Sequence, residues 1–511
     1  MYLFLILISA FIMSILLSLA AFNASRSSME IVNDMGIGWN MANTFECFNK
    51  NKEIKNPEDQ ITLWGNQFPK KEIFTRLKKY GFKTILFPVT WFHFMESSGK
   101  VKQEWMEKVK EVVDMIIESN MYCILNIHND GQEGNWLSKG LKAKEIYIVL
   151  WQQIADEFKI YDDHLIFESM NDVIYKNGDD YDYKTLLKLT QSFVDVIRSS
   201  GGNNENRLLL ISGADTNLEL TCSEDYKMPI DPSNKLAVSI HYYIPYQFTI
   251  EKDDDPYFWI DENGEKVIIP PLTKWGSEGQ YKDMFTNFET MKKSFVDKGI
   301  PVILGEVGVL TEQKKEIESI REFLFAQFSM SSCYDGIMSC LWDNSNIGDM
   351  NYYNREKDKW YDEIIKDNFK KISKGKFVKP KDYFFVSDKD SVYTLVPDGT
   401  IYMQFGAKKL KKIIFNAFIS TNLLYNAGFG ICSNNKNGAW VGESVAGNLG
   451  KRQYDGSHTF TIDVNTQDYN DYIKIEKWWG NEFITINYLT LQFDKTYNFF
   501  NFKEYNKNLA N

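Results

Sequence analysis

The sequence lacks the marks of a metalloprotein, a redox protein or a nucleic-acid-binding protein. Its 511 residues include only six cysteines, and no two of them form a Cys-x-x-Cys pair, so zinc and redox motifs have no support. It also lacks a basic excess. The net charge of −11 argues against nucleic acid or an anionic membrane surface as a partner, because either requires a basic face, whereas an uncharged substrate fits this charge. An exported chain with six cysteines has room for one or two disulfides, whose pairing the sequence leaves open.

Long hydrophobic runs are absent except at the amino terminus, where residues 2–21 are almost all apolar. Small residues in Ser18-Leu19-Ala20 stand at signal-peptidase spacing, which favours a cleaved signal peptide over residues 1–21 and a secreted protein. The alternative is a retained membrane anchor over residues 1–22, because the run is long enough to span a bilayer and no cation precedes Arg26. A membrane is therefore a partner only if this segment is retained.

The chain after Met29 alternates short apolar runs with longer amphipathic segments, which is the pattern of an α/β fold. Apolar residues make up 44% of the sequence, enough for a large core. The predicted strands are Met35–Trp39, Thr84–Pro88, Tyr122–Ile127, Leu165–Ser169, Arg207–Ser212, Leu236–His241, Val302–Glu306 and Gly336–Trp342. Segments whose apolar residues recur at helical spacing lie between most of these strands. Eight such units predict a (β/α)8 TIM barrel over residues 29–372.

A second, smaller domain is expected after the barrel. Residues 373–382 carry lysines, Gly375 and Pro380, which is typical of a linker. From Tyr383 onward the apolar period changes to two and no long amphipathic helix intervenes. We therefore expect an all-β sandwich over residues 383–500.

Polar and aromatic residues follow the predicted barrel strands, where this architecture places its chemistry. The third strand runs into His128, the fourth into Asn171-Asp172, the sixth into His241-Tyr242-Tyr243, and the eighth into Trp342. The seventh ends in Glu306. We expect Asp172 and Glu306 to face each other at the same end of the barrel.

In sequence order, these motifs resemble those of the family 5 glycoside hydrolases, the endoglucanase or cellulase-like group. The likeness covers roughly residues 30–372. The matching segments are Gly38–Thr44, Thr62–Asn66, Asn126–His128, Phe167–Asp172, His241–Tyr243, Leu304–Gly308 and Trp342. Residues 383–500 are similar, more weakly, to carbohydrate-binding modules. There Trp440 and Trp478-Trp479 are either a sugar-stacking strip or part of the sandwich core.

The resemblance implies a secreted enzyme that cleaves β-1,4-linked glucan with retention, using no metal and no organic cofactor. Glu306 takes the position of the nucleophile and Asp172 that of the acid/base. The remaining matched residues would form the substrate site. Asn171 would bind the sugar 2-hydroxyl, Tyr243 would hydrogen-bond the nucleophile, and Trp342 would stack on the face of a sugar ring. His128 and His241 would orient sugar hydroxyls and the carboxyl groups of the site.

Two positions depart from the family pattern. Asp172 stands where the family has Glu, and the shorter side chain would leave its proton about 1–1.5 Å short of the leaving oxygen unless the backbone shifts. Leu86 stands where the family has an Arg that supports the nucleophile. Because of these two departures, the alternative function is an impaired or inactive barrel that binds β-glucan without cleaving it.

Glu168, in the same motif as Asp172, is interpreted as a structural carboxylate.

Overall fold

The computed structural model describes residues 26–375 except 50–52, 133, 179, 253–257, 261–265, 269–270, 277 and 312–313, together with strands between Phe384 and Asn501. The predicted signal or anchor over residues 1–21 and most of the predicted linker lie outside the described residues. Within the described part, no helix has the length and apolar character needed to cross a membrane. Cys47, Cys123, Cys222 and Cys340 are free thiols.

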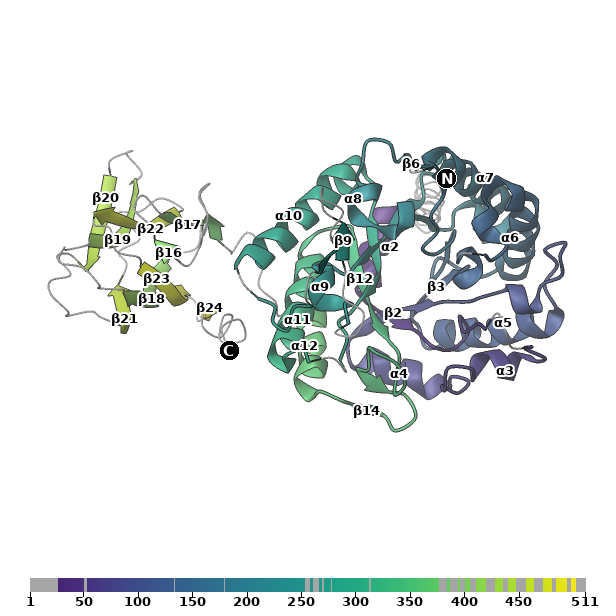
Figure 1. Cartoon of the computed structure of the whole chain (residues 1–511), viewed down its shortest axis with the longest axis horizontal. Coiled ribbons are helices and arrows are strands. Elements are labelled where there is room, and N and C mark those ends of the chain that lie inside the picture. Colours follow the sequence, from purple (N-terminus) through teal and green to yellow (C-terminus); the bar gives the residue numbers. More distant parts are fainter. Residues whose placement is uncertain are drawn as a thin grey trace, which may run out of the picture.

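Eight parallel strands close into a barrel, which confirms the predicted fold (Figure 1). Their order around the barrel is β1-β12-β11-β8-β7-β4-β3-β2. They are β1 (Ile37–Met41), β2 (Phe82–Phe87), β3 (Tyr122–Asn126), β4 (Leu165–Glu168), β7 (Leu209–Ser212), β8 (Leu236–Tyr242), β11 (Val302–Val307) and β12 (Ile337–Asp343). Each observed strand overlaps a predicted one, because buried parallel strands read as short continuous apolar runs.

Helices surround the barrel and turn their apolar faces toward it. In α4, for example, the three buried positions are Ile73, Phe74 and Leu77, at the spacing of one helical face. The helices are α4 (Lys71–Lys79), α5 (Gln103–Glu118), α6 (Lys144–Phe158), α7 (Tyr183–Ser199), α8 (Leu218–Thr221), α10 (Glu278–Ser294), α11 (Ile317–Cys333) and α12 (Glu363–Ser373). The last of these ends at Ser373, which is the first residue of the predicted linker.

A short helix, α2 (Ser28–Met35), closes the amino-terminal end of the barrel. Ser27 and Glu30 form a capping box that satisfies the first backbone amides of this helix. Its Ile31, Val32 and Met35 belong to the same buried cluster as the barrel interior. The first predicted strand was placed two residues too early, because residue 35 ends this helix and β1 starts at Ile37.

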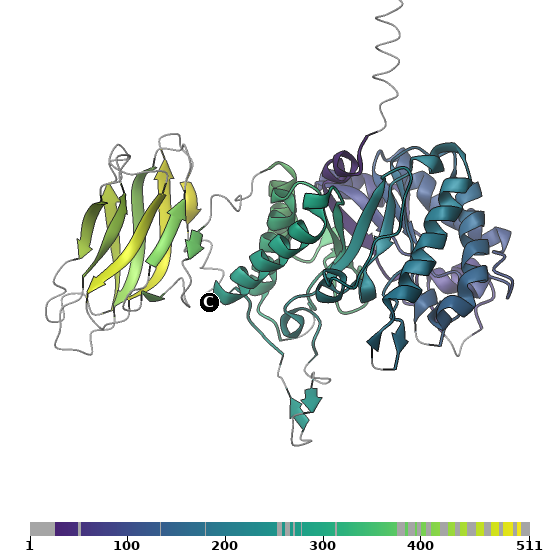
Figure 2. The same cartoon turned by 90° about the horizontal axis from the view of Figure 1, so that it is seen from above.

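Three two-stranded hairpins were not predicted. They are β5–β6 (Lys176–Asn177, Asp180–Tyr181), β9–β10 (Phe258–Ile260, Lys266–Ile268) and β13–β14 (Tyr353–Asn354, Lys359–Trp360). In Figure 2, the β9–β10 hairpin projects from the end of the barrel opposite α2. The β9–β10 hairpin therefore adds to the face at which the strands end, whereas Trp360 of β14 packs against Phe82 at the start of β2.

The strands described beyond Gly375 form two antiparallel sheets with the orders β15-β17-β22-β19-β20 and β16-β23-β18-β21, with β24 paired to β23. They are β15 (Phe384–Val386), β16 (Thr394–Leu395), β17 (Thr400–Gln404), β18 (Leu410–Ile419), β19 (Gly428–Asn434), β20 (Trp440–Ala446), β21 (Gly456–Asp463), β22 (Tyr472–Trp479), β23 (Ile484–Phe493) and β24 (Asn498–Asn501). The side chains of Trp440, Trp478 and Trp479 lie outside the described residues.

Candidate active site

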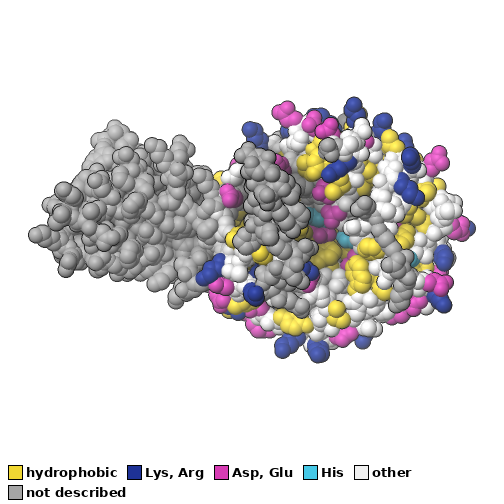
Figure 3. Space-filling model, in the orientation of Figure 1, with side chains coloured by type: hydrophobic (Ala, Val, Ile, Leu, Met, Phe, Trp, Pro, Cys, Tyr) yellow, Lys and Arg dark blue, Asp and Glu magenta, His cyan; other side chains and the backbone are white. Residues whose placement is uncertain are grey.

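The carboxyl ends of the barrel strands bring the predicted site residues together. Figure 3 looks onto this end and shows acidic and histidine side chains gathered near the middle of the face. Glu306 lies in β11 and pairs with His241 of the neighbouring β8. Asp172 follows β4 in the chain, and one carboxylate oxygen of Asp172 and one of Glu306 lie within 4.8 Å of each other. The expected facing pair is therefore present.

A β-bulge positions the Glu306 side chain. The register of β11 with both of its neighbours shifts after Leu304, so that Gly305 is the extra residue. A Cβ at Gly305 would lie 3.2 Å from Leu86 Cδ1, a tight contact, so the close approach of Leu86 favours glycine in the bulge. Its carbonyl accepts a hydrogen bond of 3.1 Å from Asn40 Nδ2. The bulge directs the next side chain to the site.

Glu306 is buried and has three polar neighbours. Its side chain is 8% exposed, and its Oε2 accepts a 3.0 Å hydrogen bond from the Tyr243 hydroxyl. His241 Nδ1 lies 3.4 Å from the same oxygen, and His128 Nε2 lies 4.0 Å from Oε1. These contacts are the ones expected for a carboxylate that must be held in one orientation.

Asp172 is held by its backbone and by two donors. Its φ of 43° lies in the left-handed region, which the short side chain of aspartate tolerates. Its Oδ1 accepts a hydrogen bond from the Thr216 hydroxyl and lies 3.1 Å from His241 Nδ1. The side chain remains 36% exposed, so a ligand can approach it. Thr216 was not foreseen, because it enters the site from the 3-10 turn after β7 (Ala214–Thr216) and carries no motif.

Burial and charge set the protonation of the site. Burial raises the pKa of Glu306 to about 8, and the nearby Asp172 carboxylate adds to this rise against the opposing effect of His241. Burial also acts to raise the pKa of Asp172, but the charge of His241 and the bonds from His241 and Thr216 outweigh it and lower that pKa to about 2. The two carboxyls are close enough to titrate as a pair. The surroundings therefore favour the proton on Glu306 and the negative charge on Asp172.

The two site histidines differ in charge. Burial acts to lower the pKa of His241, but the carboxylates of Asp172 and Glu306 outweigh it and raise the pKa to about 10. Burial lowers the pKa of His128 to about 3, so that this ring is neutral. The His128 and Trp342 rings are nearly parallel, with centroids 5.8 Å apart and an angle of 21°. Asn171 is also at the site and is 4% exposed.

Glu168 lies below the pair, in the barrel interior. It is fully buried, and its two oxygens accept hydrogen bonds from Asn126 Nδ2 at 3.0 Å and Ser239 Oγ at 2.6 Å. The first bond joins β4 to its neighbour β3, and the second reaches β8, which lies beyond β7. This is the environment expected of a structural carboxylate rather than a reacting one.

Leu86 packs in the apolar interior of the barrel. It is 2% exposed and contacts the cluster that includes Ile124 and Ile303. Among the residues that the structure describes, the ion pairs of Asp172 and Glu306 involve only His241 and His128. The site is thus a carboxylate pair whose cationic neighbour is the His241 imidazole, with the neutral His128 ring beside it.

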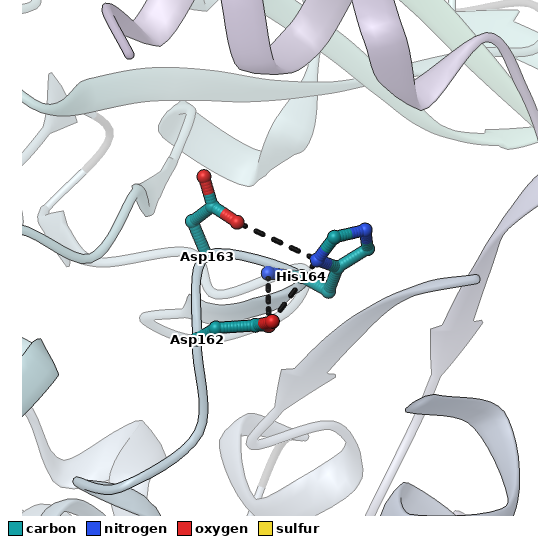
Figure 4. Close-up of side chains that lie close together, drawn as sticks. All are labelled: Asp162, Asp163 and His164. Atoms are coloured by element: carbon teal, nitrogen blue, oxygen red, sulfur yellow. Dashed lines mark hydrogen bonds and ion pairs between the residues drawn. The ribbon is translucent and has the colours of Figure 1, made fainter. Parts of the chain in front are cut away.

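A second cluster of potential metal ligands lies at the amino-terminal ends of the strands (Figure 4). His164 Nδ1 is 3.2 Å from Asp162 Oδ1 and 3.4 Å from Asp163 Oδ1. Asp163 Oδ2 also accepts two hydrogen bonds from Arg26, at 2.8 and 2.6 Å. Asp163 is therefore paired with a cation of this chain.

The chain is similar to known glycosidases over the barrel. A family model described as "Cellulase (glycosyl hydrolase family 5)" matches residues 40–348. A solved structure of a GH5-4 broad specificity endoglucanase from an uncultured bovine rumen ciliate is 61% identical, with a TM-score of 0.67 over 68% of this chain and 99% of that one.

More distant relatives are of the same kind. Endoglucanase A of Clostridium longisporum is 32% identical, and the match covers 67% of this chain and 65% of that protein's length. A family 5 lichenase mutant from Caldicellulosiruptor sp. F32, solved in complex with cellotetraose, is 29% identical, with a TM-score of 0.60 over 68% of this chain and 96% of the other.

Proposed function

Since the chain belongs to glycosyl hydrolase family 5, we propose that it hydrolyses β-1,4-linked glucan with retention, with Glu306 as nucleophile and Asp172 as acid/base. The observation that supports this best is the approach of their carboxylate oxygens to within 4.8 Å. Retaining glycosidases hold their carboxyls about 5–5.5 Å apart, whereas inverting enzymes leave about 6.5–9.5 Å for a water molecule.

In the first step of the proposed reaction, Asp172 donates its proton to the glycosidic oxygen as Glu306 attacks the anomeric carbon. In the second, Asp172 takes a proton from a water molecule that attacks the same carbon and releases Glu306. The bound sugar must first draw the shared proton from Glu306 to Asp172. Positive charge that develops at the anomeric carbon favours an ionised Glu306, so the substrate itself drives this redistribution.

The proposed substrate class is supported by the relatives and by the Trp342 ring. Relatives in this family are described as a broad specificity endoglucanase and a lichenase. Trp342 offers a partly exposed ring beside the catalytic pair, and aromatic rings stack on the apolar faces of sugars. We therefore propose an endo-acting enzyme for β-glucans.

The test is the release of reducing ends from carboxymethylcellulose, lichenan, xyloglucan and mannan, with the configuration of the first product read by NMR. We expect turnover on the glucans and a β-anomer as the first product. The variant Asp172→Ala should lose turnover of the glucans, because the leaving sugar oxygen is no longer protonated. With an aryl β-cellobioside whose phenolate leaves without protonation, the variant should still form the glycosyl-enzyme, and added azide should restore turnover by attacking it without general-base help to yield a β-glycosyl azide. An α-anomer, or no rescue, would contradict the assignment.

A second candidate function is β-glucan binding without cleavage. It is favoured by Leu86 and by the location of the shared proton on Glu306 in the unliganded site. Folded protein that binds cello-oligosaccharides in calorimetry but releases no reducing ends from any glucan would favour this candidate over the enzyme.

We also propose that the protein is exported with residues 1–21 as a cleaved signal, and that residues 383–500 bind polysaccharide. The small residues at 18–20 support the first and the antiparallel strands with period-two patterning support the second. Amino-terminal sequencing of the mature protein tests the first. Retention of the full chain on insoluble cellulose when the barrel site is saturated with cellotetraose tests the second.

A further inference from the structure

The catalytic pair and Glu168 form a group of three carboxyls with an unusual shortage of counter-charge. Among the described residues, no lysine or arginine forms an ion pair with Asp172 or Glu306. Glu168 is fully buried and receives its two hydrogen bonds from neutral groups. Carboxyls this close cannot all ionise without a nearby cation.

His241 occupies the place where a cation would act on both catalytic carboxyls. Its Nδ1 lies 3.1 Å from Asp172 Oδ1 and 3.4 Å from Glu306 Oε2, and its side chain is 7% exposed. One ring nitrogen therefore contacts two carboxyls that come from different strands. A charge-assisted bond in this position fixes their separation.

His241 and Leu86 pack against the same point of β11. A Cβ at Gly305 would lie 3.2 Å from Leu86 Cδ1 and 3.7 Å from His241 Nε2. That Nε2 is buried and has no hydrogen-bond partner among the described residues. The imidazole thus extends toward the place that an arginine at position 86 would take.

We propose that His241 is a positioning residue that acts as an imidazolium and supplies the positive charge that Leu86 does not. The inference rests on the proposed roles of Glu306 and Asp172. The proposal also implies that the His241 imidazolium and an arginine at position 86 would not both be charged. A protonated Nε2 without a hydrogen-bond acceptor is costly, so His241 should lose its proton when a guanidinium placed beneath the carboxylate pair supplies the positive charge.

The titratable groups that face His241 support this charge. Three carboxyls face the ring, Asp172, Glu306 and Glu168, and Asp172, whose pKa is lowered, contributes most to its protonation. His128 is neutral, and Tyr243 keeps its proton because burial raises its pKa. Asp215, after β7, is a further acidic neighbour, whose pKa burial raises to about 6.

The direct test is the side-chain ¹⁵N NMR spectrum of the histidines in the full chain between pH 5 and 9. The chain has five histidines, and His241→Asn and His128→Asn assign the two that matter. We expect both nitrogens of His241 to be protonated at pH 7. His128 is the matched control, a neutral ring in the same pocket. A neutral His241 at pH 7 would overturn the proposal.

A kinetic cycle measures the consequence. His241→Asn keeps a hydrogen-bond donor but removes the charge, and it should lower kcat/KM about 10- to 100-fold. In a Leu86→Arg background the same substitution should cost less than about threefold, because the charge is then supplied from β2. Equal losses in both backgrounds would contradict the proposal. If Leu86→Arg does not fold, as judged by circular dichroism, the NMR titration of the unaltered chain decides.

These outcomes separate this inference from the function on which it rests. If azide fails to rescue Asp172→Ala, the proposed catalytic pair is wrong. If azide rescues that variant but His241 is neutral at pH 7, the pair stands and only the role of His241 falls.

Discussion

The carboxylates at the two ends of the barrel have different ion-pair partners. At the amino-terminal end, Arg26 bonds Asp163 and Asp34, and Tyr122 donates to Asp34 at 2.6 Å. Lys83 adds a second cation to Asp34 at 3.2 Å. At the carboxyl end, the ion-pair partners of Asp172 and Glu306 among the described residues are imidazoles, with no lysine or arginine. One end uses paired charges to close the fold, and the other keeps unbalanced charges that a substrate can reorganise.

The largest effect should come from removing the carboxylate of Glu306, the proposed nucleophile. Glu306→Gln should lower kcat by on the order of 10³-fold or more, because no other carboxyl reaches the anomeric carbon. Its stability to urea should equal or exceed that of the parent, since a buried acid is replaced by a neutral amide. Substantial turnover by the purified, folded variant would show that the nucleophile lies elsewhere.

The next effect is the dependence of kcat/KM on pH. The pKa of Asp172 is lowered to about 2 and that of Glu306 is raised to about 8, so the pair carries one proton between these values. Activity should therefore be retained toward acid and lost as pH rises through about 8, reaching about a tenth of its plateau near pH 9. The pKa of His241 is raised to about 10, so the loss of its proton does not cause the fall in activity near pH 8. A profile that is flat to pH 10 would contradict this order of protonation.

A smaller effect is expected at the opposite end. Asp163→Asn removes the charge that Arg26 binds, and because both groups are about one-third exposed the loss in unfolding free energy should be about 1 kcal/mol. Urea denaturation measures it. The specific activity of the folded variant should stay at the parental value, and a large loss of activity would mean that the two ends are coupled.

The smallest effect concerns α2, the helix that closes the amino-terminal end of the barrel. Ser27→Ala removes the capping side chain of α2 and should cost about 0.5 kcal/mol, toward the low end for such caps because Ser27 is exposed. The midpoint of thermal unfolding should shift by a few degrees at most. Ser98→Ala, in an exposed turn, is the matched control and should shift it less.

The fold was predictable from sequence where burial dictated it. A run such as Val302–Leu304 has to be a buried strand, and Glu306 at its end then belongs to the carboxyl face. α2 was missed although Ser27 and Glu30 carry the capping-box signature, because Met35 was assigned to the following apolar run. The hairpins were missed because their strands are only two or three residues long.

The site was predictable in its members and less so in its charges. The motifs named Asp172, His241 and Glu306, and the structure brings them together. The left-handed backbone of Asp172 and the bond from Thr216 depend on a turn that is distant in sequence. The order of protonation depends on burial and on three-dimensional neighbours, and no pattern along the chain encodes either.

The position of α2 has a practical consequence. Because the chain enters the barrel at the end away from the reacting carboxyls, a support coupled ahead of Ser27 would leave the sugar-binding face directed to the surrounding solution. The same geometry would serve a cell-surface enzyme if residues 1–22 were kept as an anchor. Immobilised through its first residues, the protein should process long polymers as well as it does when dissolved.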